Sequence, residues 1–208
     1  MTAEQDAELI QQILAGDREQ YALLMRKYNT MLYRIGRAYG FTDADTEDIM
    51  QETFIQAYMQ LHRLRRPRAF QKWLATIMVR MCYQAQHRAR LTTSWEQAPA
   101  SSTFTPNMEN SDLKHWLEQA ILQLPQAYRI VFVMKELNGY SIRQIAHITG
   151  ISVINVKVRL FRARQMLRQI LTQAQVTDEL LAFEAPRCEA LADRVMKAIR
   201  GAYQQLHV

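Results

Sequence analysis

Apolar residues recur at every third or fourth position along almost all of the first ninety residues of this chain. One stripe passes through Tyr21, Leu24 and Tyr28, and a later one runs from Phe70 to Met81. Such spacing places side chains on one face of an α-helix and predicts amphipathic helices that pack against one another. Only six glycines and five prolines occur among the 208 residues, which disfavours a turn-rich β fold. The sequence therefore predicts an all-α protein.

Composition and charge divide the chain into four segments. Residues 91–112 carry three acidic and no basic side chains, with prolines and small polar residues, as is typical of a flexible linker. Residues 113–172 carry nine basic and two acidic side chains. We predict two small helical domains, at residues 1–90 and 113–172, joined by this linker. A C-terminal extension at residues 173–208 follows, in which helical spacing of apolar residues predicts an amphipathic helix from Ala190 to about Leu206.

Residues 141–168 have the pattern of a helix-turn-helix. Ser141 and Ser152 stand where side chains cap two successive helices, and Gly150 stands at the turn between them, where a positive φ is often needed. Spacing directs four apolar residues of the second helix toward the core: Val156, Leu160, Ala163 and Leu167. A helical hairpin with a solvated basic face would share these features. A preceding helix is expected over residues 128–137, ended by Asn138 and Gly139.

The same segment resembles region 4 of extracytoplasmic-function (ECF) sigma factors. Residues 145–164 follow the family run E-I-A … L-G-I-S-x-G-T-V-K-S-R-L-x-R-A-R, and residues 124–132 follow its lead-in L-P-x-x-x-R-x-V-F. This chain has Ile154, Asn155 and Val158 where the family usually has Gly, Thr and Ser. These departures fall at the start of the second helix, so the resemblance implies duplex binding without implying a particular promoter sequence.

The N-terminal half resembles the same family independently. Residues 45–54 are similar to the D-A-E-D-L-V-Q-E-T-F of sigma region 2, and residues 70–77 to its F-R-x-W-L-x-x-I. With both halves in the expected order, the chain is identified as a member of the ECF subfamily of sigma-70 factors. The resemblance implies a protein that binds core RNA polymerase and directs promoter-specific transcription initiation at −10 and −35 elements.

Five residues around the acidic helix of region 2 are the expected core-polymerase contacts. The resemblance implies that this helix docks on the clamp of the largest subunit, and an acidic and amide face with an aromatic anchor suits a basic partner. These residues are Asp45, Asp48, Gln51, Glu52 and Phe54. The alternative is that the acids complement the helix N-terminus and that Phe54 is a core residue.

Basic residues of both halves are the expected promoter contacts. For the −10 region they are Arg63, Arg65, Arg66, Arg68, Lys72, Arg80 and Arg88. For the −35 region, on the second helix of the helix-turn-helix, they are Ser152, Asn155, Lys157, Arg159, Arg162 and Arg164. A melted strand needs a cationic groove, whereas the duplex offers phosphates and base edges. A merely solvated basic loop is the alternative for the −10 set.

The remaining expectations concern partners and chemistry. The family resemblance implies contacts with the clamp and flap of core RNA polymerase, promoter DNA and an anti-sigma factor. No apolar run reaches the length of a membrane span and the N-terminus does not resemble a signal peptide, so a cytoplasmic protein is expected, without membrane insertion. No catalytic set, phosphate loop or metal-ligand spacing occurs in the sequence, so neither an enzyme nor a cofactor is expected. A stand-alone helix-turn-helix regulator is the competing hypothesis, but it leaves the region 2 pattern unexplained.

Overall fold

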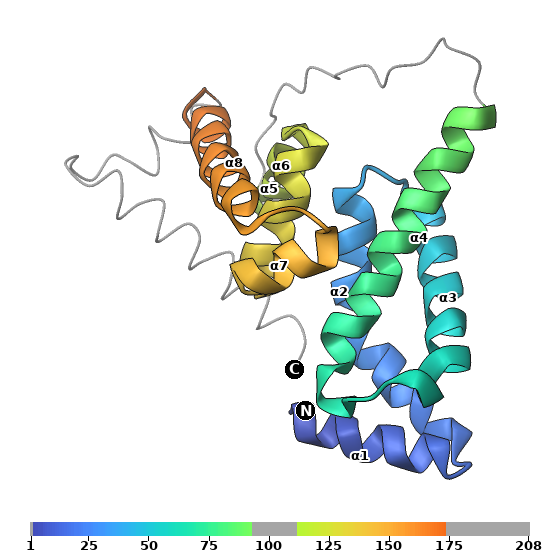
Figure 1. Ribbon diagram of the computed structural model, residues 1–208. Coiled ribbons are helices and arrows are strands. Elements are labelled where there is room, and N and C mark those ends of the chain that lie inside the picture. The colour runs from blue at the N-terminus through green and yellow to red at the C-terminus, as the bar shows by residue number, and fades with distance from the viewer. Residues whose placement is uncertain (1, 93–111, 174–208) are drawn as a thin grey trace.

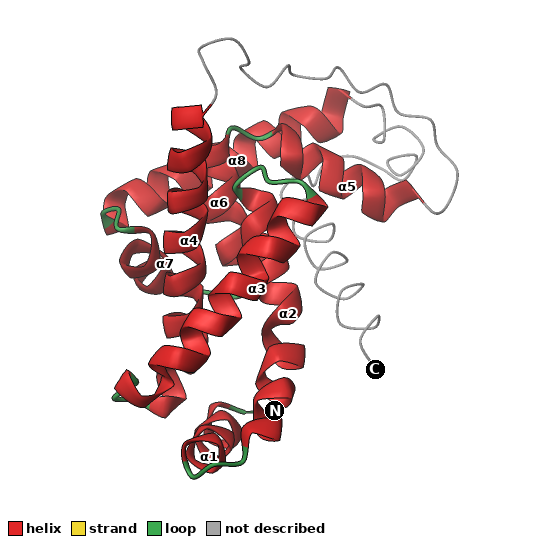
Figure 2. Ribbon diagram, turned by 90° about the vertical axis from the view of Figure 1, so that its right-hand side faces the viewer, coloured by secondary structure: helices red, strands yellow, loops and turns green. Residues whose placement is uncertain are grey.

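The structure is a computed structural model that describes residues 2–92 and 112–173. Over these residues it is helical and contains no strand, which confirms the predicted all-α class (Figures 1 and 2). The first half consists of α1 (Ala3–Leu14), α2 (Tyr21–Ala38), α3 (Asp43–Gln60) and α4 (Phe70–Thr92). Short 3-10 turns connect them at Arg18–Gln20, Leu61–Arg63 and Pro67–Ala69. The second half consists of α5 (Asp112–Gln123), α6 (Gln126–Phe132), a π-helical turn (Val133–Leu137), α7 (Ile142–Thr149) and α8 (Val153–Gln173). The helix predicted at Ala190 lies outside the described residues.

Helices α2, α3 and α4 pack side by side, and α1 lies across one end of them (Figure 1). Leu32, Phe70 and Leu74 are fully buried between these helices. Gly36 of α2 lets α3 approach closely, because a Cβ at this position would lie 2.5 Å from Cγ2 of Thr46. A larger residue at Gly36 would therefore force α2 and α3 apart.

A buried carboxylate fastens α1 to α2. Asp6 is 3% exposed, and it accepts hydrogen bonds from the Lys27 ammonium at 2.5 Å and from the Tyr28 hydroxyl. Burial, followed by the hydrogen bond to Asp6, raises the pKa of Tyr28 above its ordinary value. Both neighbours satisfy a charge that would otherwise be costly to bury, so these contacts hold α1 against α2.

The helix-turn-helix forms as predicted. Ser141 caps α7 in a capping box with Gln144, and Gly150 adopts a left-handed φ of 72° at the turn. The Ser152 hydroxyl accepts a hydrogen bond from the backbone N–H of Asn155 at 3.2 Å. The four predicted inward residues of α8 are all buried: Val156, Leu160, Ala163 and Leu167.

The segment before the helix-turn-helix differs from the expected single helix over residues 128–137. It begins at Gln126 directly after Pro125, whose ring suits the start of a helix, and it widens into a π-helical turn at Val133. The N–H of Asn138 reaches back five residues to the carbonyl of Val133 at 3.0 Å. Glu136 lies within the wide turn and is 7% exposed, where it meets Arg164 of α8. Hydrophobic periodicity carries no signal for such an insertion.

The two halves touch directly, which the sequence did not indicate. The Arg129 guanidinium donates to the carbonyl of Ala38 at 2.8 Å and to that of Leu122 at 2.5 Å, and thereby bridges α2 to the second half. Burial, and then the neighbouring Arg37 cation, lower the pKa of Arg129 from its ordinary value. Tyr140, 2% exposed, donates toward the Met31 sulfur at 2.9 Å and the Gln71 carbonyl at 3.3 Å. Arg129 and Tyr140 therefore form a polar interface between the described halves, which is termed the joint.

Candidate polymerase and nucleic-acid interfaces

Helix α3 presents an acidic face to solvent. Asp45, Asp48, Gln51 and Glu52 are all exposed, and residues 43–60 contain five acidic and no basic side chains. Thr42 caps the helix by accepting a hydrogen bond from the N–H of Asp45 at 3.1 Å, and its hydroxyl lies 2.6 Å from the Asp45 carboxylate. Asp45 is thus hydrogen-bonded to the cap residue Thr42, whereas Asp48 and Glu52, one helical turn apart, are exposed to solvent. A negative surface of this kind complements a basic partner.

Phe54 lies on the opposite face of α3, inside the bundle. It is 5% exposed, its ring packs edge-on against Tyr21 at 6.5 Å, and its backbone carbonyl accepts a hydrogen bond from the Tyr21 hydroxyl at 2.7 Å. In this structure Phe54 therefore supports α3 from within, as the core interpretation expects, and does not reach the acidic face.

Two exposed apolar residues of α3 were not among those expected from the sequence. Ile55 is 51% exposed and Met59, one turn later, is 69% exposed. They continue the surface that begins with Asp48 and Glu52, at helical spacings of three and four residues. The sequence signal that could have identified them is their helical position, which lies off the buried stripe of Thr53, Phe54 and Ala57. An exposed apolar patch with polar and charged residues around it fits the apolar core and polar rim of a protein-binding surface.

The segment between α3 and α4 is a cationic loop. Arg63, Arg65, Arg66 and Arg68 are all exposed. The chain leaves helical geometry at Leu64 and begins a new 3-10 turn at Pro67, a residue that disfavours a continuous helix. Arg68 lies 3.5 Å from Glu4 of α1, but both side chains are largely exposed, so this ion pair leaves the guanidinium accessible.

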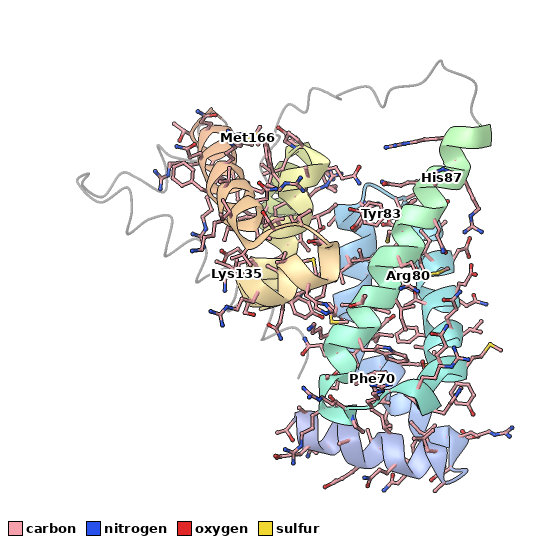
Figure 3. The ribbon with its side chains drawn as sticks, viewed as in Figure 1. Phe70, Arg80, Tyr83, His87, Lys135 and Met166 are labelled. Carbon is pink, nitrogen blue, oxygen red and sulfur yellow. The ribbon has the colours of Figure 1, made fainter. Side chains whose placement is uncertain are left out.

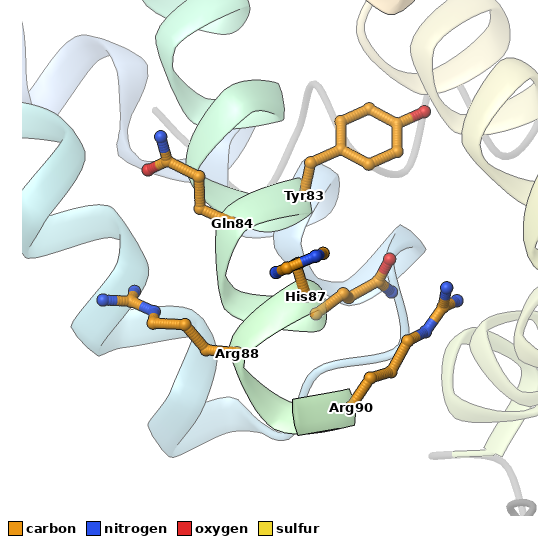
Figure 4. Close-up of a pocket in the computed structure, with 6 residues that line it drawn as sticks. Tyr83, Gln84, His87, Arg88 and Arg90 are labelled. Atoms are coloured by element: carbon orange, nitrogen blue, oxygen red, sulfur yellow. The ribbon is translucent and has the colours of Figure 1, made fainter. Parts of the chain in front are cut away.

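Helix α4 extends the cationic surface. Lys72 is half-buried near its start, and Arg80 and Arg88 are exposed further along. Arg80, Tyr83 and His87 follow one another toward the C-terminal end of α4 (Figure 3). This end borders an open pocket lined by Tyr83, Gln84, Gln86, His87, Arg88 and Arg90. Figure 4 shows Tyr83 and Arg90 on one side of α4, and Gln84 and Arg88 on the other.

Aromatic residues of α4 divide between core and surface. Phe70 is fully buried with its ring 5.9 Å from that of Trp73, so it packs in the core as its place on the apolar stripe indicates. Tyr83 was not expected as a site residue, yet it is 50% exposed and its ring meets Tyr39 edge-on at 5.4 Å. An accessible aromatic ring on the same side of the helix as a cation, here Arg90, can stack on an unpaired base.

Helix α8 carries the third surface. Ser152, Asn155, Lys157, Arg162 and Arg164 are exposed, and Arg159 is half-buried. The Arg162 guanidinium donates to the Tyr128 hydroxyl at 3.3 Å. Arg164 lies 2.5 Å from the buried carboxylate of Glu136, so its head group is held toward the π-helical turn. The expected cations are therefore brought onto one helix, but Arg164 also has an internal partner.

The outward face of α8 is apolar in its first turns. Ile154 is 72% exposed, Val158 is 42% exposed and Phe161 is 61% exposed. None of them was expected as a site residue, although the sequence marked positions 154 and 158 as departures from the family run. In Figure 1, α3 and α8 lie on opposite sides of the molecule, with α2 and α4 between them.

Comparison with known proteins identifies both halves of the chain. Sigma-70 region 2 matches residues 24–92, and sigma-70 region 4 matches residues 114–167. The ECF RNA polymerase sigma factor SigM of Mycobacterium tuberculosis is 30% identical over 168 residues, which cover 80% of this chain and 84% of SigM. The ECF sigma-E factor of Salmonella typhimurium is 30% identical over 176 residues, covering 78% and 92%. Among solved structures, CnrH in complex with the cytosolic domain of CnrY matches with a TM-score of 0.58 at 24% identity, over 81% of this chain and 97% of CnrH.

Two helical regions of this kind, in this order, define a sigma-70-type transcription initiation factor. Within that class, the chain belongs to the family of ECF RNA polymerase sigma factors, and it acts in promoter-directed transcription initiation. Over the described residues, no helix is both long and apolar enough to span a membrane.

Proposed function

We propose that this sigma factor divides its contacts among three surfaces. Residues 1–90 hold core RNA polymerase and the −10 element, and residues 113–172 hold the −35 element. The observation that carries the proposal is the segregation of charge: all the charged residues of α3 are acidic, whereas the loop before α4 and helix α8 expose cations. A protein that must bind both a polymerase and a polyanion benefits from such a separation.

The proposed polymerase contact is the outward face of α3, through Asp48, Gln51 and Glu52, with Asp45 at its N-terminal edge. Exposure of these residues and of the neighbouring Ile55 and Met59 supports this assignment. The acids would meet a basic partner helix and the apolar pair would provide the desolvated centre of the contact. Phe54 acts from the core, by fixing the helix that displays them. The clamp and the flap of core polymerase are the proposed partners for the two halves.

The proposed −10 contact combines the cationic loop with α4. Arg63, Arg65 and Arg66 would follow the strand backbone, with Arg68 beside them. Lys72, Arg80 and Arg88 would continue this path along α4. Support comes from the exposure of the arginines. The accessible ring of Tyr83 lies on the same helix, on the side away from Arg88. Cations along a strand and an aromatic ring for a base are what an opened duplex requires.

The proposed −35 contact is α8. The N-terminal residues of the second helix in a helix-turn-helix reach base edges, and flanking cations contact phosphates. Asn155 and Lys157 lie within the first two turns of α8, and Arg159 and Arg162 follow. Ser152 would contribute by capping α8, through the hydrogen bond that it accepts from the N–H of Asn155. Arg164 would both contact DNA and pair with Glu136.

We further propose that the protein is cytoplasmic, that it catalyses no reaction itself and that an anti-sigma factor regulates it. The last point rests on relatives: CnrH is solved with the cytosolic domain of CnrY, and the Bartonella quintana sigma factor RpoE with the anti-sigma factor NepR. No group of three potential metal ligands occurs among the described residues.

The test is reconstitution with bacterial core RNA polymerase. Size-exclusion chromatography would report binding, and transcription of a genomic fragment library with start-site mapping would report initiation. Co-elution with new, discrete start sites is the expected result. Specific DNA binding by the free protein without co-elution would instead favour a stand-alone regulator and contradict the proposal.

A further inference from the structure

The face of α8 that points away from the core is apolar where a DNA-reading helix meets the bases. With 3.6 residues per turn, positions 154, 158 and 165 lie on the side opposite the buried residues Val156, Leu160 and Ala163. Ile154 at 72% exposure and Val158 at 42% therefore point away from the core in the first two turns. Two exposed apolar side chains one helical turn apart indicate a surface that binds a partner.

Charge around this pair identifies the partner as nucleic acid. Residues 153–173 contain five basic and no acidic side chains. On the helix, Lys157 lies to one side of the Ile154–Val158 pair, whereas Asn155 and Arg162 lie to the other. An apolar strip between two cationic edges matches a DNA major groove, with phosphates on both walls and base edges along the floor.

Only one group on that floor is apolar. Thymine carries a C5-methyl group in the major groove, whereas the other base edges present donors and acceptors. Ile and Val offer neither a donor nor an acceptor, so they cannot discriminate guanine or adenine by hydrogen bonding. Glycine or serine, usual at these positions in the family run, would not make the same methyl contact.

We propose that Ile154 and Val158 are specificity-determining residues that read thymine methyl groups in the −35 element of this protein's promoters. The inference rests on the proposed −35 role of α8 and deepens it. It assigns Ile154 and Val158 to thymine contacts, and it leaves phosphate binding to the flanking cations. The −35 element should accordingly hold thymine, on either strand, at the positions facing these two residues.

The experiment uses holoenzyme assembled from the full chain and core polymerase. A promoter library randomised over the −35 element is first selected for initiation. In the selected promoter, each thymine of the element is then replaced singly by deoxyuridine, which removes the methyl group and nothing else. We expect a loss of about fourfold in half-saturating promoter affinity at one or two positions, the factor expected for burial of one methyl group.

Variants assign the effect to the two side chains. In Ile154→Ser and Val158→Ser, the ratio of affinities for thymine and deoxyuridine should fall to about one at the position each residue faces. Gln165→Ala, on the same outward face further along α8, should keep the wild-type ratio. All three positions are exposed, so the variants should fold, and thermal melts followed by circular dichroism would verify this.

Three results would overturn the inference. Insensitivity of wild-type holoenzyme to every deoxyuridine would exclude methyl reading, and so would sensitivity that survives in both serine variants. Loss of core co-elution by Ile154→Ser or Val158→Ser would show that the apolar strip docks on polymerase. If wild-type holoenzyme failed to initiate even on thymine-containing promoters, the proposed function itself would fail, so the two failures are distinguishable.

Discussion

Helices α3 and α8 are built alike but carry opposite charge. Each buries one stripe against its own half of the molecule and begins with a hydroxyl cap, Thr42 for α3 and Ser152 for α8. Each exposes an apolar pair one turn apart, Ile55 with Met59 and Ile154 with Val158. They differ in that α3 carries five acidic and no basic residues, whereas α8 carries five basic and no acidic residues.

In both helices the buried face determines how the helix packs in the fold, and the exposed face determines which partner it can bind. Similar amphipathic scaffolds can serve a protein on one side of the molecule and a polyanion on the other. Because the two helices lie on opposite sides (Figure 1), both partners could be engaged without competing for one surface. Changes confined to one exposed face should therefore affect one partner only.

The largest effect is expected from reversing charge on α3. Asp48→Lys combined with Glu52→Lys should weaken core polymerase binding by at least about 100-fold, because like charges would then face the basic partner. Fluorescence titration of labelled protein with core polymerase would measure the change. Glu8→Lys with Glu19→Lys makes the same change in net charge at exposed positions outside α3 and should leave binding within about threefold. Equal loss in both pairs would show that net charge, not α3, governs binding.

A smaller and different effect is expected on α8. Lys157→Gln should reduce promoter affinity of the holoenzyme by about tenfold and lower the slope of log affinity against log salt by about one, as for loss of one phosphate contact. Core binding should not change. Affinities measured by filter binding between about 50 and 200 mM salt would provide the slope. An unchanged slope with lower affinity would place Lys157 at a base edge instead.

Arg164 of α8 is expected to contribute to stability as well as to DNA binding. Arg164→Gln should lower the free energy of unfolding by about 1 kcal/mol, because it removes a charged partner of buried Glu136, and the effect is moderated because the Arg164 side chain is 56% exposed. Urea denaturation would measure it. Arg168→Gln, exposed on the same helix, is the matched control and should change stability by less than about 0.5 kcal/mol. An equal loss of unfolding free energy in both variants would mean that the Arg164–Glu136 ion pair does not stabilise the fold.

The smallest effect concerns the joint between the two halves. Tyr140→Phe keeps the ring but removes the hydroxyl that donates toward Met31 and Gln71. The free energy of unfolding should fall by about 0.5–1 kcal/mol. In hydrogen exchange, amides of both α2 and α7 should lose protection together. Loss confined to α7 would show that the halves open independently.

Much of the fold could be predicted from the sequence, since amphipathic spacing and caps are local. The α8 core residues and the turn at Gly150 follow directly from spacing and backbone preference. The π-helical turn at Val133 could not be predicted, because hydrophobic periodicity carries no signal for one extra residue within a helix. The joint at Tyr140 could not either, since contacts across more than a hundred residues leave no local pattern.

The candidate surfaces were predictable in outline. Charge and family resemblance pointed to α3, the arginine loop and α8, and the structure exposes the charged residues expected there, apart from half-buried Lys72 and Arg159. Phe54 was left open between surface and core because helical spacing alone fits both. Met59 and Ile154 were not identified, although both lie off the buried stripes, because charge and family resemblance single out charged residues and carry no signal for exposed apolar ones.

Position-specific photocrosslinking tests the central claim most directly. Benzoylphenylalanine would replace Met59 of α3 in one protein and Phe161 of α8 in another, both positions being more than half exposed. The probe at 59 should crosslink to core polymerase in holoenzyme, both with and without promoter DNA. In the holoenzyme–promoter complex, the probe at 161 should crosslink to promoter DNA near the −35 element. A probe at 59 that captured DNA, or a probe at 161 that captured only polymerase, would contradict the assignment of one partner to each helix.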